Sequence, residues 1–325
     1  MRSLLFALCF LSCLLGLTES LSLSVKDTAS RRDFIDSLSR TSAAAIASTT
    51  IPATLLANEA SNAADVEPFC VIGANGKTGT KCVQELLDRK YPVRATSRSG
   101  IYASETEIQN SLLSPMECDV TIPSTIDKAV KGSRAVIFAA SASKTGGTPA
   151  QVDNEGLVNV AKACIAAKVP HLVIVSSGSV TKPESAVFKF LNLFGKIMEE
   201  KIKGEDAVRS LYAGAEGVTY TVIRPGGLTE EPGRGVAALE LNQGDTKSGR
   251  ISRYDVASLC IESTFYPELT GGTTYECYDA DTGKSLNSVG ISNIMKQKTD
   301  PAEFTTGKER NGDSWKALFT GLERD

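Results

Sequence analysis

The sequence predicts an α/β domain built on a doubly wound parallel sheet, and three observations favour this fold class. Short apolar runs of strand length alternate with amphipathic helical segments from residue 69 onward, a pattern typical of a parallel sheet covered by helices on both faces. A glycine-rich turn joins the first strand to the first helix. The residues that end the strands are mostly small, as expected where a ligand lies close to the backbone.

The first strand and the turn after it carry the most informative motif. Residues 69–80 read FCVIGANGKTGT, and Val83, Leu86 and Leu87 mark the apolar face of the helix that follows. A strand, a glycine turn and a helix N-terminus can hold a pyrophosphate through unpaired backbone N–H groups and the helix dipole. The spacing is G-x-x-G-x-x-G, which differs from the better known G-x-G-x-x-G. The predicted cofactor contacts in this motif are Gly73, Asn75, Gly76, Lys77, Thr78 and Gly79.

The later elements follow in order along the chain. Strands are expected at residues 93–97, 116–118, 135–139, 172–175, 219–223 and 273–278, and helices at 124–130, 151–167, 188–211, 254–265 and 315–322. The run 135–139 is apolar throughout, so both of its faces should be buried. Together these elements place residues 65–325 in a single domain, a length that suits one large α/β fold.

Ligands of an open parallel sheet bind outside the carboxyl ends of its strands. Beyond the glycine turn, those ends contribute Arg98, Asp119, Val120, Ala139, Ala140, Ser141, Pro225 and Gly226 to the predicted cofactor site. The second strand ends near Arg94, Ser97 and Arg98, without the acidic residue that would bind the ribose 2′-OH of NAD. Because a guanidinium pairs bidentately with a 2′-phosphate, NADP is favoured over NAD. The alternative for Arg98 is an ordinary solvated charge.

Composition excludes several other functions. The net charge is −3 without a basic stripe, so nucleic acid is not an expected partner. One histidine, His171, leaves no His-based metal site, and no metal is predicted. The cysteines of the folded part lie in apolar runs without a C-x-x-C spacing, which indicates core packing. A small-molecule substrate is therefore the expected ligand beside the cofactor.

The first 64 residues have the character of a targeting sequence. Residues 1–20 contain an apolar run behind Arg2 that is typical of a signal peptide and short for a membrane span, although a retained anchor is the alternative. Residues 21–64 form a transit-like leader, largely disordered, with a twin-arginine-like signal at Arg31 and Arg32; a plain linker is the alternative. Two signals in series resemble the leaders of algal plastid proteins. The prediction is a plastid protein, extended to the thylakoid lumen, with no stable membrane span after processing.

Five motifs together resemble the atypical NAD(P)H-binding branch of the short-chain dehydrogenase/reductase superfamily, which includes NmrA-like, biliverdin reductase B-like and plastid members. They are VIGANGKTG at 71–79, CDVT at 118–121, VIVSSGSV at 173–180, YTVIRPGGL at 220–228 and GRISRYDVA at 249–257. The resemblance covers residues 69–279. It implies a Rossmann-like NAD(P)-binding domain in which Asp119 contacts the adenine.

Catalytic members of this superfamily use a serine and a Tyr/Lys pair four residues apart. The resemblance places Ser177 at the serine and Lys201 at the lysine, but Ile197 stands where the tyrosine is expected, and no tyrosine occurs between Tyr102 and Tyr212. In those members the tyrosine hydroxyl gives the substrate its proton or takes it, and the lysine ammonium lowers the pKa of that hydroxyl. The absence of this tyrosine disfavours alcohol–ketone chemistry. It favours a flavin or quinone as the hydride acceptor, because such an acceptor can take its proton from water. The alternatives are that Lys201 is a solvated surface lysine and that Ser177 bonds only backbone.

The sequence therefore predicts an NADPH-dependent plastid oxidoreductase that reduces a conjugated acceptor. The nicotinamide is expected against Ser141, Ser177, Pro225 and Gly226, and the substrate over residues 178–179 and 227–228. Residues 141–150 and 228–247 are the expected substrate loops. The alternative class is a non-catalytic NADP(H)-binding regulator or an assembly factor for photosynthetic complexes, which would act through protein partners.

Overall fold

The computed structural model describes residues 66–325 except 105–109, 144–145, 194 and 287–304. All of them belong to one compact unit, Asn62–Asp325. The signal peptide and leader predicted for residues 1–64 lie outside the described residues and stay predictions. Within the described part, no helix is both long and apolar enough to cross a bilayer.

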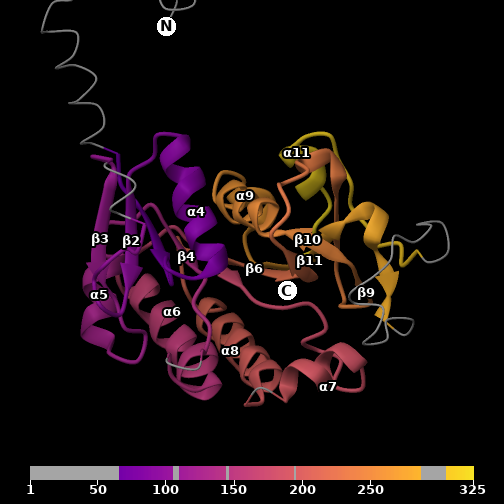
Figure 1. Ribbon diagram of the computed structural model, residues 1–325, viewed down its shortest axis with the longest axis horizontal. Coiled ribbons are helices and arrows are strands. Elements are labelled where there is room, and N and C mark those ends of the chain that lie inside the picture. Colours follow the sequence, from indigo (N-terminus) through magenta and orange to yellow (C-terminus); the bar gives the residue numbers. More distant parts are fainter. Residues whose placement is uncertain (1–65, 105–109, 144–145, 194, 287–304) are drawn as a thin grey trace, which may run out of the picture. The chain divides into compact units, whose positions relative to one another are not determined.

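An eight-stranded sheet forms the centre of the unit (Figure 1). From edge to edge its strands are β3 (Leu113–Glu117), β2 (Val93–Ser97), β1 (Phe69–Ile72), β4 (Ala135–Phe138), β5 (His171–Val175), β6 (Thr219–Pro225), β11 (Thr273–Asp279) and β8 (Leu239–Asn242). Neighbouring strands are parallel except β8, which pairs antiparallel with β11. The strand order reverses between β1 and β4, where open sheets of this kind bind ligands. The predicted doubly wound fold is confirmed.

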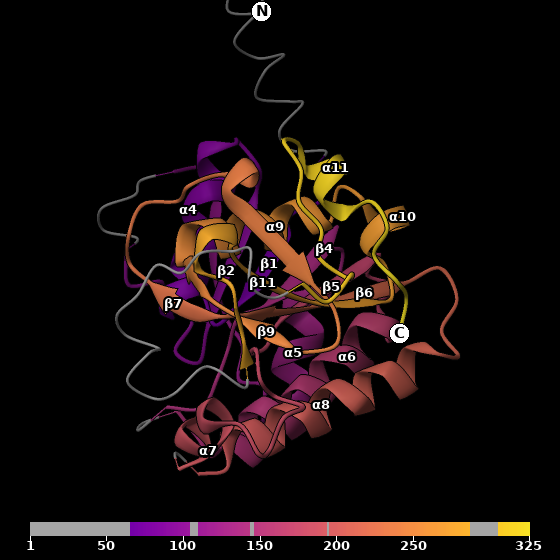
Figure 2. The ribbon, with the colours of Figure 1, turned by 90° about the vertical axis from the view of Figure 1, so that its right-hand side faces the viewer.

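Helices cover both faces of the sheet (Figures 1 and 2). One face carries α4 (Lys77–Asp88), α9 (Arg253–Ser263), the short α10 (Pro267–Thr270) and α11 (Trp315–Phe319). The other carries α5 (Pro123–Val130), α6 (Leu157–Ala166), α7 (Ala186–Asn192) and α8 (Ile197–Tyr212). Successive residues of β1 serve the two layers in turn, because side chains alternate along a strand: Val71 packs in the first core cluster and Cys70 and Ile72 in the second.

Two predicted helices differ from the observed ones. The helix expected at 151–167 begins as a π-helical segment, η1 (Ala150–Gly156), before α6 starts. The helix expected at 188–211 is broken into α7 and α8 by a turn in which Gly195 and Lys196 adopt left-handed backbone, with φ of 72° and 64°. The segments α7 and α8 are therefore separate elements.

Sequence patterns missed five short strands in the C-terminal part: β7 (Gly227–Thr229), β8, β9 (Lys247–Ser248), β10 (Arg250–Ser252) and β12 (Lys284–Ser285). The turns η2 (Val236–Ala238) and η3 (Ala280–Thr282) lie between them. The prediction of a substrate loop over 228–247 is therefore wrong in part, because β8 is an edge strand of the main sheet. Its burial rests on pairing with β11, a partner distant in sequence.

Cysteine and histidine side chains of the described part belong to the core. The six cysteines there are unpaired and buried, and burial raises the pKa of the Cys118 thiol to about 12. Burial also lowers the pKa of His171 to about 3, while its Nε2 lies 2.8 Å from Thr221 Oγ1. These groups have structural roles.

Candidate functional site

The glycine turn after β1 is shaped by contacts that leave no room for side chains. Gly73 has a φ of 81°, and a Cβ there would lie 2.8 Å from the backbone N and Cα of Ala140. A Cβ on Gly79 would lie only 2.2 Å from the carbonyl oxygen of Gly73. Helix α4 therefore begins directly against the turn, with Gly76 as its N-cap and no acidic residue in its first turn. Its unpaired N–H groups and dipole fit a pyrophosphate.

A cavity of about 630 Å³ runs along the carboxyl ends of β1 to β4, and we call it the cofactor groove. Of the predicted cofactor residues, the structure brings to its lining Gly73, Asn75, Gly76, Arg98, Asp119, Val120, Ala139, Ala140 and Ser141. The charged side chains in the lining are Arg98, after β2, and Asp119, after β3. The groove thus has a cation and no carboxylate at the end of β2.

Hydrogen bonds fix the walls of this groove. The Asn75 side chain donates to the carbonyl of Ile101 at 2.9 Å and accepts from the backbone N–H of Ala103 at 2.8 Å. Asp119 Oδ1 accepts from both the N–H and the hydroxyl of Thr121, at 2.9 and 2.7 Å. Both side chains of the groove are therefore held by the loops that follow β2 and β3.

Three residues considered for the cofactor lie elsewhere. Arg94 points to the C-terminal end of α5, where its Nη1 donates to the carbonyl of Ala129 at 3.0 Å, so it does not share the role proposed for Arg98. Lys77 is exposed, with its Nζ 3.5 Å from Glu230 Oε1, and lines neither cavity of the site. Gly79 contributes through the close packing of α4 and not through the lining.

A second cavity, of about 530 Å³, adjoins the groove and shares Ala139, Ala140 and Ser141 with it. We call it the apolar cavity because most of the large side chains in its lining are apolar: Val175, Val187, Phe190, Leu191, Ile197, Met198, Pro225 and Leu228. Thr78 and Gly226, predicted to touch the cofactor, also line it. The two cavities thus meet at the carboxyl end of β4.

The structure brings both predicted catalytic residues, Ser177 and Lys201, to the apolar cavity, together with Ile197. Ser177 Oγ donates to the carbonyl of Gly178 at 3.1 Å. This contact agrees with the alternative in which Ser177 bonds only to backbone. Ser179 is fully buried and does not line the cavity, so its predicted place under the substrate is wrong.

Asp153 is the residue that the sequence reasoning missed. Its Oδ1 lies 2.8 Å from Lys201 Nζ and accepts from Ser141 Oγ at 2.7 Å, while Oδ2 accepts from the N–H of Ala142 at 2.9 Å. The carboxylate is fully buried, and the Lys201 side chain is only 12% exposed. The solvated-lysine alternative is therefore wrong, because Lys201 is ion-paired beside the junction of the cavities.

Local backbone geometry places this ion pair. Asp153 lies in the π-helical segment η1, a wide turn that often marks functional sites. Helix α8 approaches it closely at Gly204, where a Cβ would lie 2.6 Å from the carbonyl oxygen of Asp153. The available sequence signal was Asp153 itself. It directly follows Val152 in the predicted helix, and the other buried residues of that helix are apolar or glycine.

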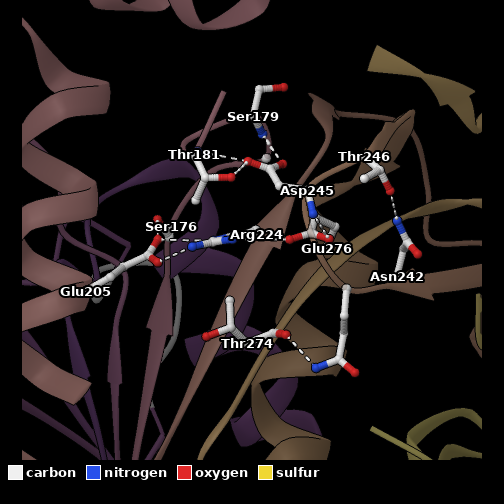
Figure 3. Close-up of polar contacts among 12 residues, drawn as sticks. Ser176, Ser179, Thr181, Glu205, Arg224, Asn242, Asp245, Thr246, Thr274 and Glu276 are labelled. Carbon is white, nitrogen blue, oxygen red and sulfur yellow. Dashed lines mark hydrogen bonds and ion pairs between the residues drawn. The ribbon is translucent and has the colours of Figure 1, made fainter. Parts of the chain in front are cut away.

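A buried polar network supports the cavity wall at Ser176 (Figure 3). Ser176 Oγ and Arg224 Nη2 both donate to Glu205, at 2.5 and 2.6 Å, and Arg224 Nη1 donates to Glu276 Oε1 at 3.3 Å. Burial, with a contribution from the nearby Asp245 carboxylate, raises the pKa of Glu276 to about 8. The Arg224 guanidinium of β6 thereby joins helix α8 to β11, and the Glu205 carboxylate also holds Ser176, which follows β5.

The same network holds the segment after β5. Asp245 accepts from the N–H of Ser179 at 2.6 Å and from the N–H and hydroxyl of Thr181, both at 2.9 Å (Figure 3). Ser179 has a φ of 68°, a conformation that needs such support in a residue other than glycine. This arrangement positions Ser177 and Gly178 on the cavity wall.

Comparisons with known proteins agree with this geometry. The chain matches the NAD(P)H-binding family over residues 73–267. It is 31% identical over 222 residues to "Uncharacterized protein At2g34460, chloroplastic" of Arabidopsis thaliana, covering 65% of this chain and 76% of that protein. It is 30% identical over 225 residues to "Protein TIC 62, chloroplastic" of Pisum sativum, covering 62% of this chain but only 40% of that relative.

Two further matches have the word reductase in their names. Sanguinarine reductase of Eschscholzia californica is 28% identical over 235 residues, which cover 59% of this chain and 81% of that protein. The solved structure of ChuY, described as an anaerobillin reductase from Escherichia coli O157:H7, superposes with a TM-score of 0.53 at 20% identity, over 66% of this chain and 98% of that chain. The structural match supports the fold alone.

Proposed function

Because this chain belongs to the NAD(P)H-binding family, in its atypical short-chain dehydrogenase/reductase form, we propose that it is an NADPH-dependent oxidoreductase that reduces a conjugated acceptor. The observation that carries the proposal is the meeting of the two cavities at Ala139–Ser141. One cavity is bordered by a glycine turn suited to a pyrophosphate, and the other is apolar and suited to a flat organic molecule. A cofactor bound in the groove and a substrate bound in the apolar cavity would touch each other at this junction.

The residues of the groove fit the parts of NADPH. The N-terminus of α4 would hold the pyrophosphate and Asp119 would face the adenine. Arg98 would pair with the 2′-phosphate, which supports NADP over NAD because the lining has no carboxylate at the end of β2 to bind a free 2′-OH. The nicotinamide would lie at Ser141, beside Ser177 and Gly226.

When bound, NADPH would supply a hydride, two electrons with one hydrogen, and a quinone or flavin completes its reduction with one proton from water. The side chains of this protein would position the two reactants. Asp153 holds the Ser141 hydroxyl and the Lys201 ammonium at the junction. Ile197 contributes an apolar contact where an acid would stand. The acceptor must therefore stabilise its own product anion, as flavins and quinones do.

We further propose a plastid location. The relatives At2g34460 and TIC 62 are both named chloroplastic, and two targeting-like segments precede the folded unit in the sequence. Lumenal delivery by the twin-arginine-like signal is a separate proposal, which depends on residues 31 and 32 alone.

The test is NADPH binding by fluorescence titration, followed by NADPH oxidation with a panel of flavins and quinones. Turnover is the expected result. Tight NADPH binding without turnover of any acceptor would favour the rival function, a regulator or assembly factor. Lys201→Met should slow turnover because Asp153 loses its cation, whereas Lys203→Met, on the same helix, removes only an exposed pair with Glu200 and should not.

A further inference from the structure

A hydroxyl group stands where the two cavities meet. The cofactor groove and the apolar cavity share Ala139, Ala140 and Ser141 in their described linings, and Ser141 is the one of the three with a polar side chain. Ser141 is also an exposed residue. A ligand in either cavity can therefore reach its Oγ, and the hydrogen-bonding properties of this atom bear on which ligands fit.

The proton of this hydroxyl is already used inside the protein. Ser141 Oγ donates to Asp153 Oδ1 at 2.7 Å, and the same carboxylate oxygen lies 2.8 Å from the Lys201 ammonium. A hydrogen bond to a charged group is roughly twice as strong as one between neutral groups. Because a serine hydroxyl has one proton and two lone pairs, Ser141 offers a ligand only its lone pairs.

The fold holds the Asp153 carboxylate in this orientation. Its Oδ2 accepts from the N–H of Ala142 at 2.9 Å, so both carboxylate oxygens are engaged. Turning the carboxylate away would also leave the Lys201 ammonium, which is largely buried, without its counter-ion, and an unpaired buried charge is strongly destabilising. The direction of the hydrogen bond from Ser141 to Asp153 is therefore fixed by the surrounding structure.

The end of the neighbouring strand repeats this arrangement. Ser176, which follows β5, lines the apolar cavity, and its Oγ donates to Glu205, a carboxylate that also accepts from Arg224. The hydroxyls at the ends of β4 and β5 are thus both hydrogen-bond acceptors toward a ligand. A carbonyl oxygen placed against either hydroxyl would bring lone pair against lone pair, whereas an N–H or O–H group would complete a hydrogen bond.

We propose that Ser141 selects the substrate by accepting a hydrogen bond from an N–H or O–H group on the edge of its conjugated ring system. This inference rests on the proposed function and narrows its substrate class. Hydride acceptors with such a donor, for example the imide N–H of a flavin, are preferred over those with carbonyl oxygens alone, such as an unsubstituted quinone. The hydrogen bond contributes to binding and not to hydride transfer, so a quinone is still reduced but binds more weakly.

The experiment compares lumiflavin, which has an N3–H group, with 3-methyllumiflavin, in which a methyl group replaces that hydrogen on the same ring system. Flavin fluorescence gives the Kd of each for the full chain with saturating NADP⁺. We expect the unmodified protein to bind lumiflavin about 2- to 10-fold more tightly, the range for one neutral hydrogen bond. Ser141→Cys should abolish this preference, because sulfur keeps the side-chain size but is a weak acceptor. Ser210→Cys, at an exposed serine of α8 outside both cavities, is the matched control and should keep it.

Three results would overturn the inference: equal binding of the two flavins by the unmodified protein, a preference for lumiflavin that persists in Ser141→Cys, and no binding of either flavin. A persistent preference would mean that the shape of the cavity, and not the Ser141 hydroxyl, excludes the methyl group. NADPH oxidation with a quinone in the same preparations keeps the two proposals separate. Quinone turnover without a flavin preference would leave the proposed function standing, whereas a flavin preference that depends on Ser141, without turnover of any acceptor, would contradict the proposed function alone.

Discussion

Gly79→Ala tests whether the contact between α4 and the glycine turn builds the cofactor site. The added Cβ would lie 2.2 Å from the carbonyl oxygen of Gly73 and 3.0 Å from the Cα of Ala74. Both are backbone atoms, so α4 must move by roughly 1 Å to restore an ordinary contact of about 3.5 Å. Overpacking of this kind costs about 1–3 kcal/mol, and the better helix propensity of alanine offsets about 1 kcal/mol of it. A net loss in unfolding free energy of about 0–2 kcal/mol is expected.

The loss in cofactor affinity should be larger than the loss in stability. Displacing the first turn of α4 weakens at least one charge-assisted hydrogen bond to the pyrophosphate, worth about 1.5–3 kcal/mol, or about 10- to 100-fold in Kd. NADPH titration and urea unfolding of the same preparation measure the two effects. Gly214→Ala is the control, because nothing lies within 4 Å of the Cβ it would add. Wild-type NADPH affinity in Gly79→Ala would refute the reasoning.

Four other predictions concern separate parts of the chain. Arg98→Ala should weaken NADPH binding by about 1.5–3 kcal/mol and leave NADH binding nearly unchanged, as measured by titration of both cofactors. Burial raises the pKa of Glu276 from 4.5 to about 8; the folded state therefore keeps this proton at a pH where the unfolded state has lost it, so the contribution of Glu276 to the free energy of unfolding should fall as the pH rises from 4.5 to 8. In urea unfolding, Glu276→Gln should therefore gain stability relative to the unmodified protein as the pH rises from 4.5 to 8. Simple aldehydes should react about 10²–10⁴-fold more slowly than quinones for want of a proton donor, and Ile197→Tyr should partly restore aldehyde reduction in an NADPH-oxidation assay. A fusion of residues 1–68 to a fluorescent protein should reach the plastid by microscopy.

Each of these four has a contrary result. Equal loss of NADPH and NADH in the arginine variant would assign Arg98 a structural role. A stability difference between Glu276→Gln and the unmodified protein that does not change between pH 4.5 and 8 would mean that Glu276 is ionised in the folded state. Efficient aldehyde reduction by the unmodified protein would require another proton donor, and a secreted or cytosolic fusion would exclude the plastid.

The sequence predicted best the strands at the centre of the sheet. The run at 69–72 matches β1, and 135–139 contains β4, because an apolar run buried on both faces is visible without knowledge of its neighbours. The third strand was predicted to begin three residues late and to end one residue late, since Ser114 and Pro115 interrupt its pattern. A proline is tolerated there because β3 lies at the edge of the sheet.

The parts that sequence reasoning missed depend on distant partners. Lys201 was recognised, but its ion-pair partner Asp153 lies 48 positions earlier, in a π-helical turn that no local pattern indicates. Glu240 of β8 is a buried polar residue that accepts from Lys247 and from the hydroxyl of Tyr278. Its burial follows from those contacts and not from hydrophobicity. Both cases show that pairing of buried charges is decided by tertiary structure.

The most direct test of the central claim is a single-turnover experiment with NADPH deuterated at the transferring C4 position. The full chain, in excess over NADPH, is mixed anaerobically with a quinone, and NADPH absorbance is followed. If the cofactor groove and the apolar cavity meet at Ala139–Ser141 as described, NADPH should be oxidised in one exponential phase with a primary deuterium isotope effect. NADPH that binds but keeps its absorbance in the presence of every quinone and flavin would contradict the account.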